Sequence, residues 1–120
     1  MNRKFRLNRT SDYKRVRRLG KSYAHPLVVL VALPGEAGLT HFGVSAGRSV
    51  GNAVQRNRAK RLLREALRSY LPEVVSGWEV VLLARQPILG AAFQDVQSAV
   101  KTLLQRARIY NDDGNLPTSS

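Results

Sequence analysis

Residues 51–70 read GNAVQRNRAKRLLREALRSY, and their apolar positions recur with the spacing of an amphipathic helix. With about 100° between successive residues, the segment separates into an apolar stripe and a basic arc. The stripe contains Ala59, Leu62, Leu63, Ala66, Leu67 and Tyr70. Asn52 precedes it and predicts the N-cap, since its side chain can accept a hydrogen bond from a free N–H of the first turn. The segment therefore predicts a long helix with one face on a core.

The opposite side of this helix is basic. Arg56, Lys60, Arg64 and Arg68 recur every four residues, and like charges at that spacing destabilise a helix by roughly 0.2–0.5 kcal/mol each. A helix with an ordinary solvated face would intersperse Glu with the Arg, whereas this segment has Glu65 as its single acid. Because arginine matches phosphate oxygens bidentately, we interpret the face as a site for a polyanion. A basic face that only contacts solvent is the alternative.

The charge of the whole chain supports a polyanionic partner. The 120 residues carry 20 Lys and Arg against 8 Asp and Glu, a net charge of +12. Most of the bases fall in two blocks, residues 1–21 and 48–68. Clustered charge of this kind favours nucleic acid first and an anionic membrane second. There is no cysteine, which excludes disulfides and thiolate chemistry, and 43% hydrophobic residues suffice for one core.

The remaining pattern predicts a small α+β domain. Expected helices cover 10–19, 51–70 and 91–107, and expected strands cover 22–33, 39–46 and 77–85. The order helix-strand-strand-helix-strand-helix implies a two-layer α/β sandwich, with the helices on one side of the sheet. The second strand is expected to form a hairpin with the first. We expect a basic N-terminal arm over 1–8, a single domain over 9–108 and a flexible C-terminal tail over 109–120.

Catalytic groups are nearly absent from the sequence. His25 and His41 are the only histidines, and neither has a carboxylate at a ligand-like spacing. The acids are scattered, and no glycine-rich phosphate loop occurs. We therefore predict no catalytic residue and no metal ligand in this chain. Tyr13 lies inside a basic block and Phe42 lies in a predicted strand near the basic helix, so either ring is a candidate to stack an unpaired nucleotide or to fill the core.

These residues carry a resemblance to a known family. GNAVQRNRAKRLLREALR, centred on Arg56-Asn57-Arg58, resembles the signature of the bacterial ribonuclease P protein component. Arg6-Leu7, Asp12-Tyr13, Val16 and Gly20, then 42–45 and 80–85, are similar to the flanking pattern of that family. The resemblance implies a fold with a left-handed βαβ crossover. It also implies an accessory subunit of an endoribonuclease, whose partner RNA uses Mg²⁺ to hydrolyse the bond that releases the 5′ leader of precursor tRNA.

The resemblance also implies which residues bind RNA. Residues expected to contact the RNA subunit, with Arg68 added from the basic arc, are Arg48, Asn52, Arg56, Asn57, Arg58, Lys60, Arg61, Arg64 and Arg68. Residues expected to contact the leader are Tyr13, Arg17, Val31 and Phe42. Arg17 and Val31 stand where the family often has aromatic residues, and Ser49 stands where a second lysine is common. We therefore expect this chain to hold the leader less by stacking and more by charge.

The expected partners are the catalytic RNA of ribonuclease P and precursor tRNA, with no membrane. We expect one protein per RNA, a monomer when free, and a cytoplasmic location. A protein that binds ribosomal or other structured RNA would share the charge and the fold, but it would not need this signature helix. A helix that lies on a membrane surface is a third reading, and the apolar stripe argues against it because it lacks Trp and Phe.

Overall fold

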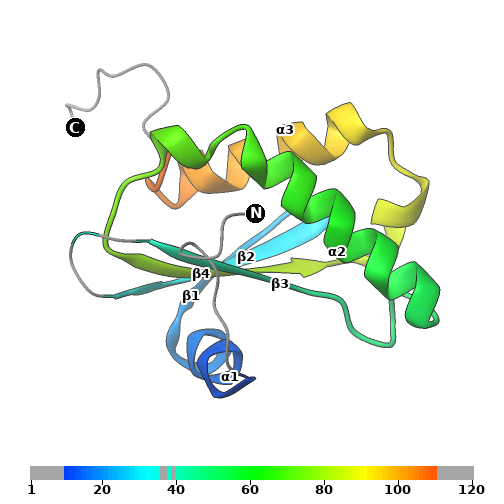
Figure 1. Ribbon diagram of the computed structural model, residues 1–120, viewed down its shortest axis with the longest axis horizontal. Coiled ribbons are helices and arrows are strands. Elements are labelled where there is room, and N and C mark those ends of the chain that lie inside the picture. The colour runs from blue at the N-terminus through cyan, green and yellow to red at the C-terminus, as the bar shows by residue number, and fades with distance from the viewer. Residues whose placement is uncertain (1–9, 36–37, 39, 111–120) are drawn as a thin grey trace.

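A four-stranded sheet separates one helix from two others in the computed structural model of the chain (Figure 1). The structure describes residues 10–35, 38 and 40–110. The helices are α1 (Thr10–Leu19), α2 (Ala53–Arg68) and α3 (Phe93–Arg106), with short 3₁₀ turns η2 (Leu71–Glu73) and η3 (Gln86–Gly90). The strands are β1 (Lys21–Ala24), β2 (Val28–Pro34), β3 (His41–Ser45) and β4 (Trp78–Ala84). The expected mixed α/β fold is confirmed.

The strand order is β1-β2-β4-β3, so the last strand of the chain lies inside the sheet. β4 pairs antiparallel with β2 and parallel with β3. The parallel pair is joined by α2, which makes β3–α2–β4 the crossover unit of the fold. Its left hand, which the family resemblance implies, stays a prediction.

The two faces of the sheet bury different residues. Alternate residues of the strands, among them Leu30, Phe42 and Leu82, pack under α2 and α3 in the main core. The other alternate set faces α1, where Val16 packs on Val31 and Val81 in a second, smaller cluster. In Figure 1, α1 lies on the opposite side of the sheet from α2 and α3. The expectation that all helices share one side is therefore wrong.

Two further expectations about the sheet are wrong. The run over 22–33 forms β1 and β2 instead of one strand, because a tight turn interrupts it at Pro26. His25 and Val28 close that turn with backbone hydrogen bonds of 3.0 and 3.2 Å, and His25 Nδ1 accepts a third from the N–H of Leu27. The predicted hairpin between 22–33 and 39–46 does not form, since β3 pairs with β4.

The domain extends past the boundary expected at residue 108. Ile109 is fully buried in the main core, and its carbonyl accepts a hydrogen bond from Val75 N–H. Tyr110 pairs with Val74 as an isolated bridge and meets the ring of Tyr70 edge-on at 5.4 Å. These two residues are therefore part of the packed domain. The predicted arm over 1–8 and the rest of the predicted tail lie outside the described residues.

Candidate nucleic-acid interface

The basic helix α2 begins with a reciprocal cap. Asn52 Oδ1 accepts from Gln55 N–H at 2.9 Å, and Gln55 Oε1 accepts from Asn52 N–H at 2.8 Å. Gly51 makes this arrangement possible, since its φ is +151° and a Cβ there would overlap the folded-back amide of Gln55. The predicted N-cap is confirmed. The side-chain oxygen of Asn52 is thus engaged by the helix, whereas its contact with RNA stays a prediction.

Arg56 is tied to the same helix start. Its Nη1 donates to the carbonyl of Gly51 at 2.9 Å, and the side chain is half-buried. Arg58 is exposed and lies about 200° round the helix from Arg56. Two arginines of the same motif therefore have different surroundings. Arg56 braces the turn before α2, whereas Arg58 has the reach of a free surface arginine.

The outer side of α2 carries a continuous row of polar side chains, which we call the basic face. It consists of Asn57, Lys60, Arg61, Arg64 and Arg68. Asn57, Arg61 and Arg68 are exposed, and Lys60 and Arg64 are partly exposed at the foot of the row. Arg68 pairs with Glu65 at 2.8 Å, a solvent-exposed contact that holds little energy and that a phosphate can replace. The basic face is therefore available to a polyanion along most of the helix.

Helix α1 presents a second group of candidate residues. Tyr13 is half-buried, and its ring lies against Gly43 of β3, where a Cβ would be 2.5 Å from Tyr13 Cζ. Arg17 follows one turn later and is exposed. About 40° separates these two side chains round the helix, so both project from the same side of α1. The structure thus places an aromatic ring and an exposed guanidinium on the same side of α1.

The sheet beside this side of α1 is only partly covered. Arg15, on the other side of the helix, reaches Glu79, two residues before Val81 on β4. Tyr13 and Arg17 leave the helix on the side away from Arg15, toward the row that lies two residues after Val81. The ring of Tyr13 rests on Gly43, the partner of Val81 in β3, and packs against the same small cluster as Val29 and Leu83. The register places Val29, Leu83 and Ser45 side by side in that row, and all three are partly exposed. We call this row the open sheet row. It offers an apolar floor next to a ring and a positive charge.

Two residues predicted to contact the leader are buried. Val31 is 2% exposed beneath α1, and Phe42 is fully buried beneath α2 and α3 on the opposite face of the sheet. Neither side chain is exposed to a ligand in this structure, so its burial gives no support to either assignment. Val29, two residues from Val31 along the same strand, lies in the open sheet row instead. Sequence reasoning missed it because the run from Leu27 to Leu33 is apolar throughout and shows no alternation.

The carboxyl ends of β3 and β4 gather further positive charge. Because these strands are parallel, Arg48 after β3 and Arg85 after β4 emerge at the same edge of the sheet, and both are exposed. The turn that contains Arg48 leads directly into the N-terminus of α2. The sequence predicts a site residue at Arg48 but not at Arg85, because only the parallel pairing of β3 and β4 shows that the two arginines lie at the same end of the sheet. Arg48 and Arg85 therefore lie at the end of the sheet that is next to the open sheet row, and the basic helix α2 begins at this same end.

Known proteins with similar sequences identify the family of this chain. The model of the Ribonuclease P family matches residues 1–108. The chain belongs to the ribonuclease P protein family. A ribonuclease P protein component from Herpetosiphon aurantiacus is 39% identical over 112 residues, covering 93% of this chain and 91% of that protein. One from Clostridium botulinum is 36% identical over 107 residues, covering 88% and 96%.

Solved structures of the ribonuclease P protein family share the fold. The protein from Staphylococcus aureus superposes with a TM-score of 0.77 at 25% identity, over 89% of this chain and 98% of that one. The protein from Thermotoga maritima gives a TM-score of 0.75 at 25% identity, over 84% and 96%. The family makes this chain the protein component of an endoribonuclease that works as a ribonucleoprotein in tRNA processing.

Two other properties of the described residues bear on partners. No helix among them has the length and apolarity required to cross a membrane. Over the same part of the chain, no three His, Asp or Glu side chains gather as a metal-binding group.

Proposed function

We propose that this ribonuclease P protein binds the catalytic RNA subunit through the basic face of α2, together with Arg48, Arg56 and Arg58. The observation that carries the proposal is the composition and exposure of this one helix, which has six bases and one acid with most of the charged groups open to solvent. These like charges repel one another along the helix and lower its stability, so a helix face without an anionic partner would gain nothing from them. Phosphate oxygens of a folded RNA relieve that repulsion.

We further propose that the 5′ leader of precursor tRNA lies on the open sheet row. Val29 and Leu83 form the floor there, Tyr13 supplies an aromatic ring, and Arg17 supplies a charge. A single strand exposes both base faces and phosphates, so it can use both kinds of group at once. The row ends at the edge that carries Arg48 and Arg85, which would let one RNA assembly contact both surfaces.

In this proposal the protein positions RNA, and hydrolysis belongs to the RNA subunit with its Mg²⁺. The protein's part is electrostatic and geometric. Guanidinium groups on α2 reduce phosphate repulsion where the two RNAs meet, and the α1 side of the sheet holds the leader in one path. We propose that one protein binds each RNA subunit and that the complex acts in the cytoplasm.

A cleavage assay tests this function directly. Precursor tRNA is incubated at low Mg²⁺ with a bacterial ribonuclease P RNA, with the protein, or with both. We expect cleavage only in the complete mixture, and we expect the variant Arg61→Glu to stimulate less than Lys101→Glu, which makes the same charge change on α3. Absence of stimulation at any salt concentration would reject the assignment. Cleavage by the protein alone would show that it contains an active site.

A further inference from the structure

Glu79 is an acidic residue in the interior of the sheet, with Leu33 of β2 and His41 of β3 as its register partners. It lies on the α1 side of β4, two residues from Val81, and its side chain is 17% exposed. Its Oε1 is buried and accepts no directed hydrogen bond from any described residue. The group that compensates its charge is Arg15 of α1, whose Nη2 lies 2.6 Å from that oxygen.

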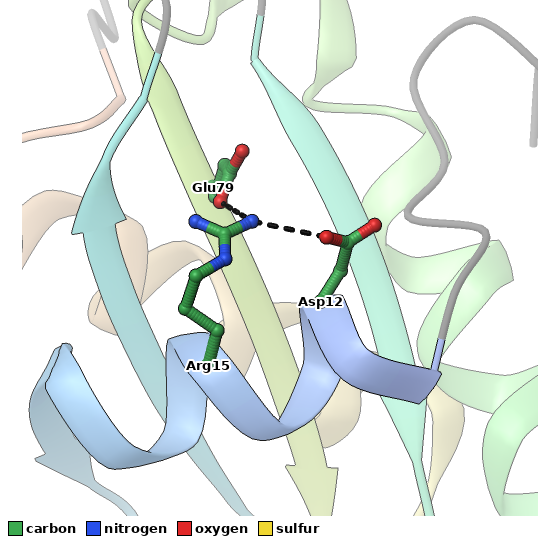
Figure 2. A network of polar contacts seen from close by, with 3 residues as sticks. All are labelled: Asp12, Arg15 and Glu79. Atoms are coloured by element: carbon green, nitrogen blue, oxygen red, sulfur yellow. Dashed lines mark hydrogen bonds and ion pairs between the residues drawn. The ribbon is translucent and has the colours of Figure 1, made fainter.

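Arg15 holds two carboxylates at once, as Figure 2 shows. The same Nη2 donates to Asp12 Oδ1 at 3.1 Å, one turn earlier in α1. The hydrogen bond to Asp12, together with the close contact and negative charge of Glu79, raises the pKa of Arg15 above its usual value. A guanidinium neutralised in this way is a poor ligand for phosphate, so Arg15 differs from its exposed neighbours Lys14, Arg17 and Arg18.

Stability alone gives little reason for this ion pair. A partly buried carboxylate loses hydration, and its attraction to a cation repays that loss only in part. Well-packed apolar side chains in the same places are often as stabilising or more so. What an ion pair adds is direction. It is satisfied in one arrangement of the two elements, whereas aliphatic contacts tolerate rolling and sliding.

Helix α1 needs such a constraint. Val16 is its one fully buried residue among those that the structure describes, and it packs on two other valines, Val31 and Val81. Arg15 leaves the helix about 100° to one side of Val16 and Tyr13 about 60° to the other. The Arg15–Glu79 pair and the contact of Tyr13 with Gly43 therefore hold α1 from both sides. Together they set its rotation on the sheet.

We propose that the Arg15–Glu79 ion pair, braced by Asp12, is a positioning device that fixes the roll of α1 and so places Tyr13 and Arg17 over the open sheet row. This inference rests on the proposed role of that row in binding the leader. Arg15 and Glu79 do not touch the leader themselves. They set the distance between the ring and charge of α1 and the floor formed by Val29 and Leu83.

The test uses the holoenzyme reconstituted from this protein and a bacterial ribonuclease P RNA. Affinity is measured for precursor tRNA with a leader and for tRNA without one, and the ratio of the two dissociation constants gives the leader preference. We expect Glu79→Gln to reduce this preference about 3- to 10-fold, as a small misplacement of binding groups does, without changing affinity for tRNA that has no leader. Glu73→Gln, an exposed change of the same charge in η2, is the matched control and should leave the preference unchanged.

A double variant separates position from stability. Arg15→Leu with Glu79→Leu replaces the ion pair with an apolar pair that should keep the fold, even where Glu79→Gln alone unfolds. We expect it to unfold at a temperature near that of the wild type and yet to lose leader preference. Arg15→Lys should keep more of the preference than Arg15→Gln. A double variant with full leader preference would overturn the proposal.

Two further variants distinguish this inference from the function on which it rests. Tyr13→Ala and Arg17→Ala remove groups proposed to touch the leader. If both keep full leader preference, the leader assignment itself is wrong, and the positioning role falls with it. If both lose the preference while the double Leu variant keeps it, the leader assignment stands and the positioning role alone is rejected.

Discussion

Arg56 and Arg58 show how much the surroundings of a residue add to its identity. They are two residues apart in one motif, and from sequence they look interchangeable. In the structure Arg56 is half-buried and bonded to the carbonyl of Gly51, whereas Arg58 is exposed on another side of α2. One guanidinium therefore has a role in the fold besides its proposed role in RNA binding, whereas the other has only the proposed role.

This difference predicts two distinct phenotypes. Arg56→Ala should lower the free energy of unfolding by about 1 kcal/mol, because a partly buried carbonyl loses its hydrogen-bond donor. It should also weaken RNA binding. Arg58→Ala should weaken RNA binding with no change in stability. Thermal unfolding followed by circular dichroism, together with titration of the RNA subunit, would measure both. Identical behaviour of the two variants in both assays would contradict this division of roles.

At the scale of single elements, local pattern was a good guide to the helices. The apolar repeat and Asn52 predict α2 nearly to its observed bounds, since helix hydrogen bonds join near neighbours in sequence. The sheet was harder, because strand pairing joins distant residues. Nothing in the apolar run over 22–33 shows which residues face which helix, and the residues around Phe42 do not show it either. The sequence alone therefore does not reveal that Val31 and Phe42 are buried. The pairing of Arg15 with Glu79 was equally invisible.

The start of α2 gives a prediction at this scale. Gly51→Ala should displace the amide of Gln55 and open the reciprocal cap, and it also places a Cβ at a positive φ. We expect a loss of about 1–2 kcal/mol in the free energy of unfolding. Gly47→Ala is the matched control, since a Cβ there meets nothing within 4 Å. Urea unfolding of the two variants would compare them, and equal stability would show that the cap does not depend on Gly51.

At the scale of the whole molecule, net charge is the property that indicates the kind of partner. The net charge of +12 and its division into two blocks were readable from sequence, and they identify the kind of partner without the fold. The fold adds arrangement. It puts α1 and α2 on opposite faces of one sheet and joins them through the edge that carries Arg48 and Arg85. Charge alone could not show that α1 and α2 lie on opposite faces of the sheet.

Salt dependence tests the electrostatic basis of RNA binding. If the basic face and its neighbours neutralise about six phosphates, the logarithm of the association constant should fall with the logarithm of salt concentration with a slope of roughly −4 to −5. Filter binding to the RNA subunit across a salt series would give this slope. Arg61→Ala should make it shallower by about one unit. A nearly flat dependence would contradict a phosphate-binding surface.

The interior place of β4 has a consequence for how the protein is made. β2 and β3 do not pair with each other, and β3 is joined to the β1–β2 pair only by β4, which is synthesised at residues 78–84. When the chain has emerged from the ribosome as far as η2, α2 has emerged with all its arginines, yet the sheet on which it packs still lacks β4. Folding as a unit must therefore wait for β4 to leave the ribosome. Until then the six bases of α2 lie close to ribosomal RNA while their helix has no complete sheet to pack on.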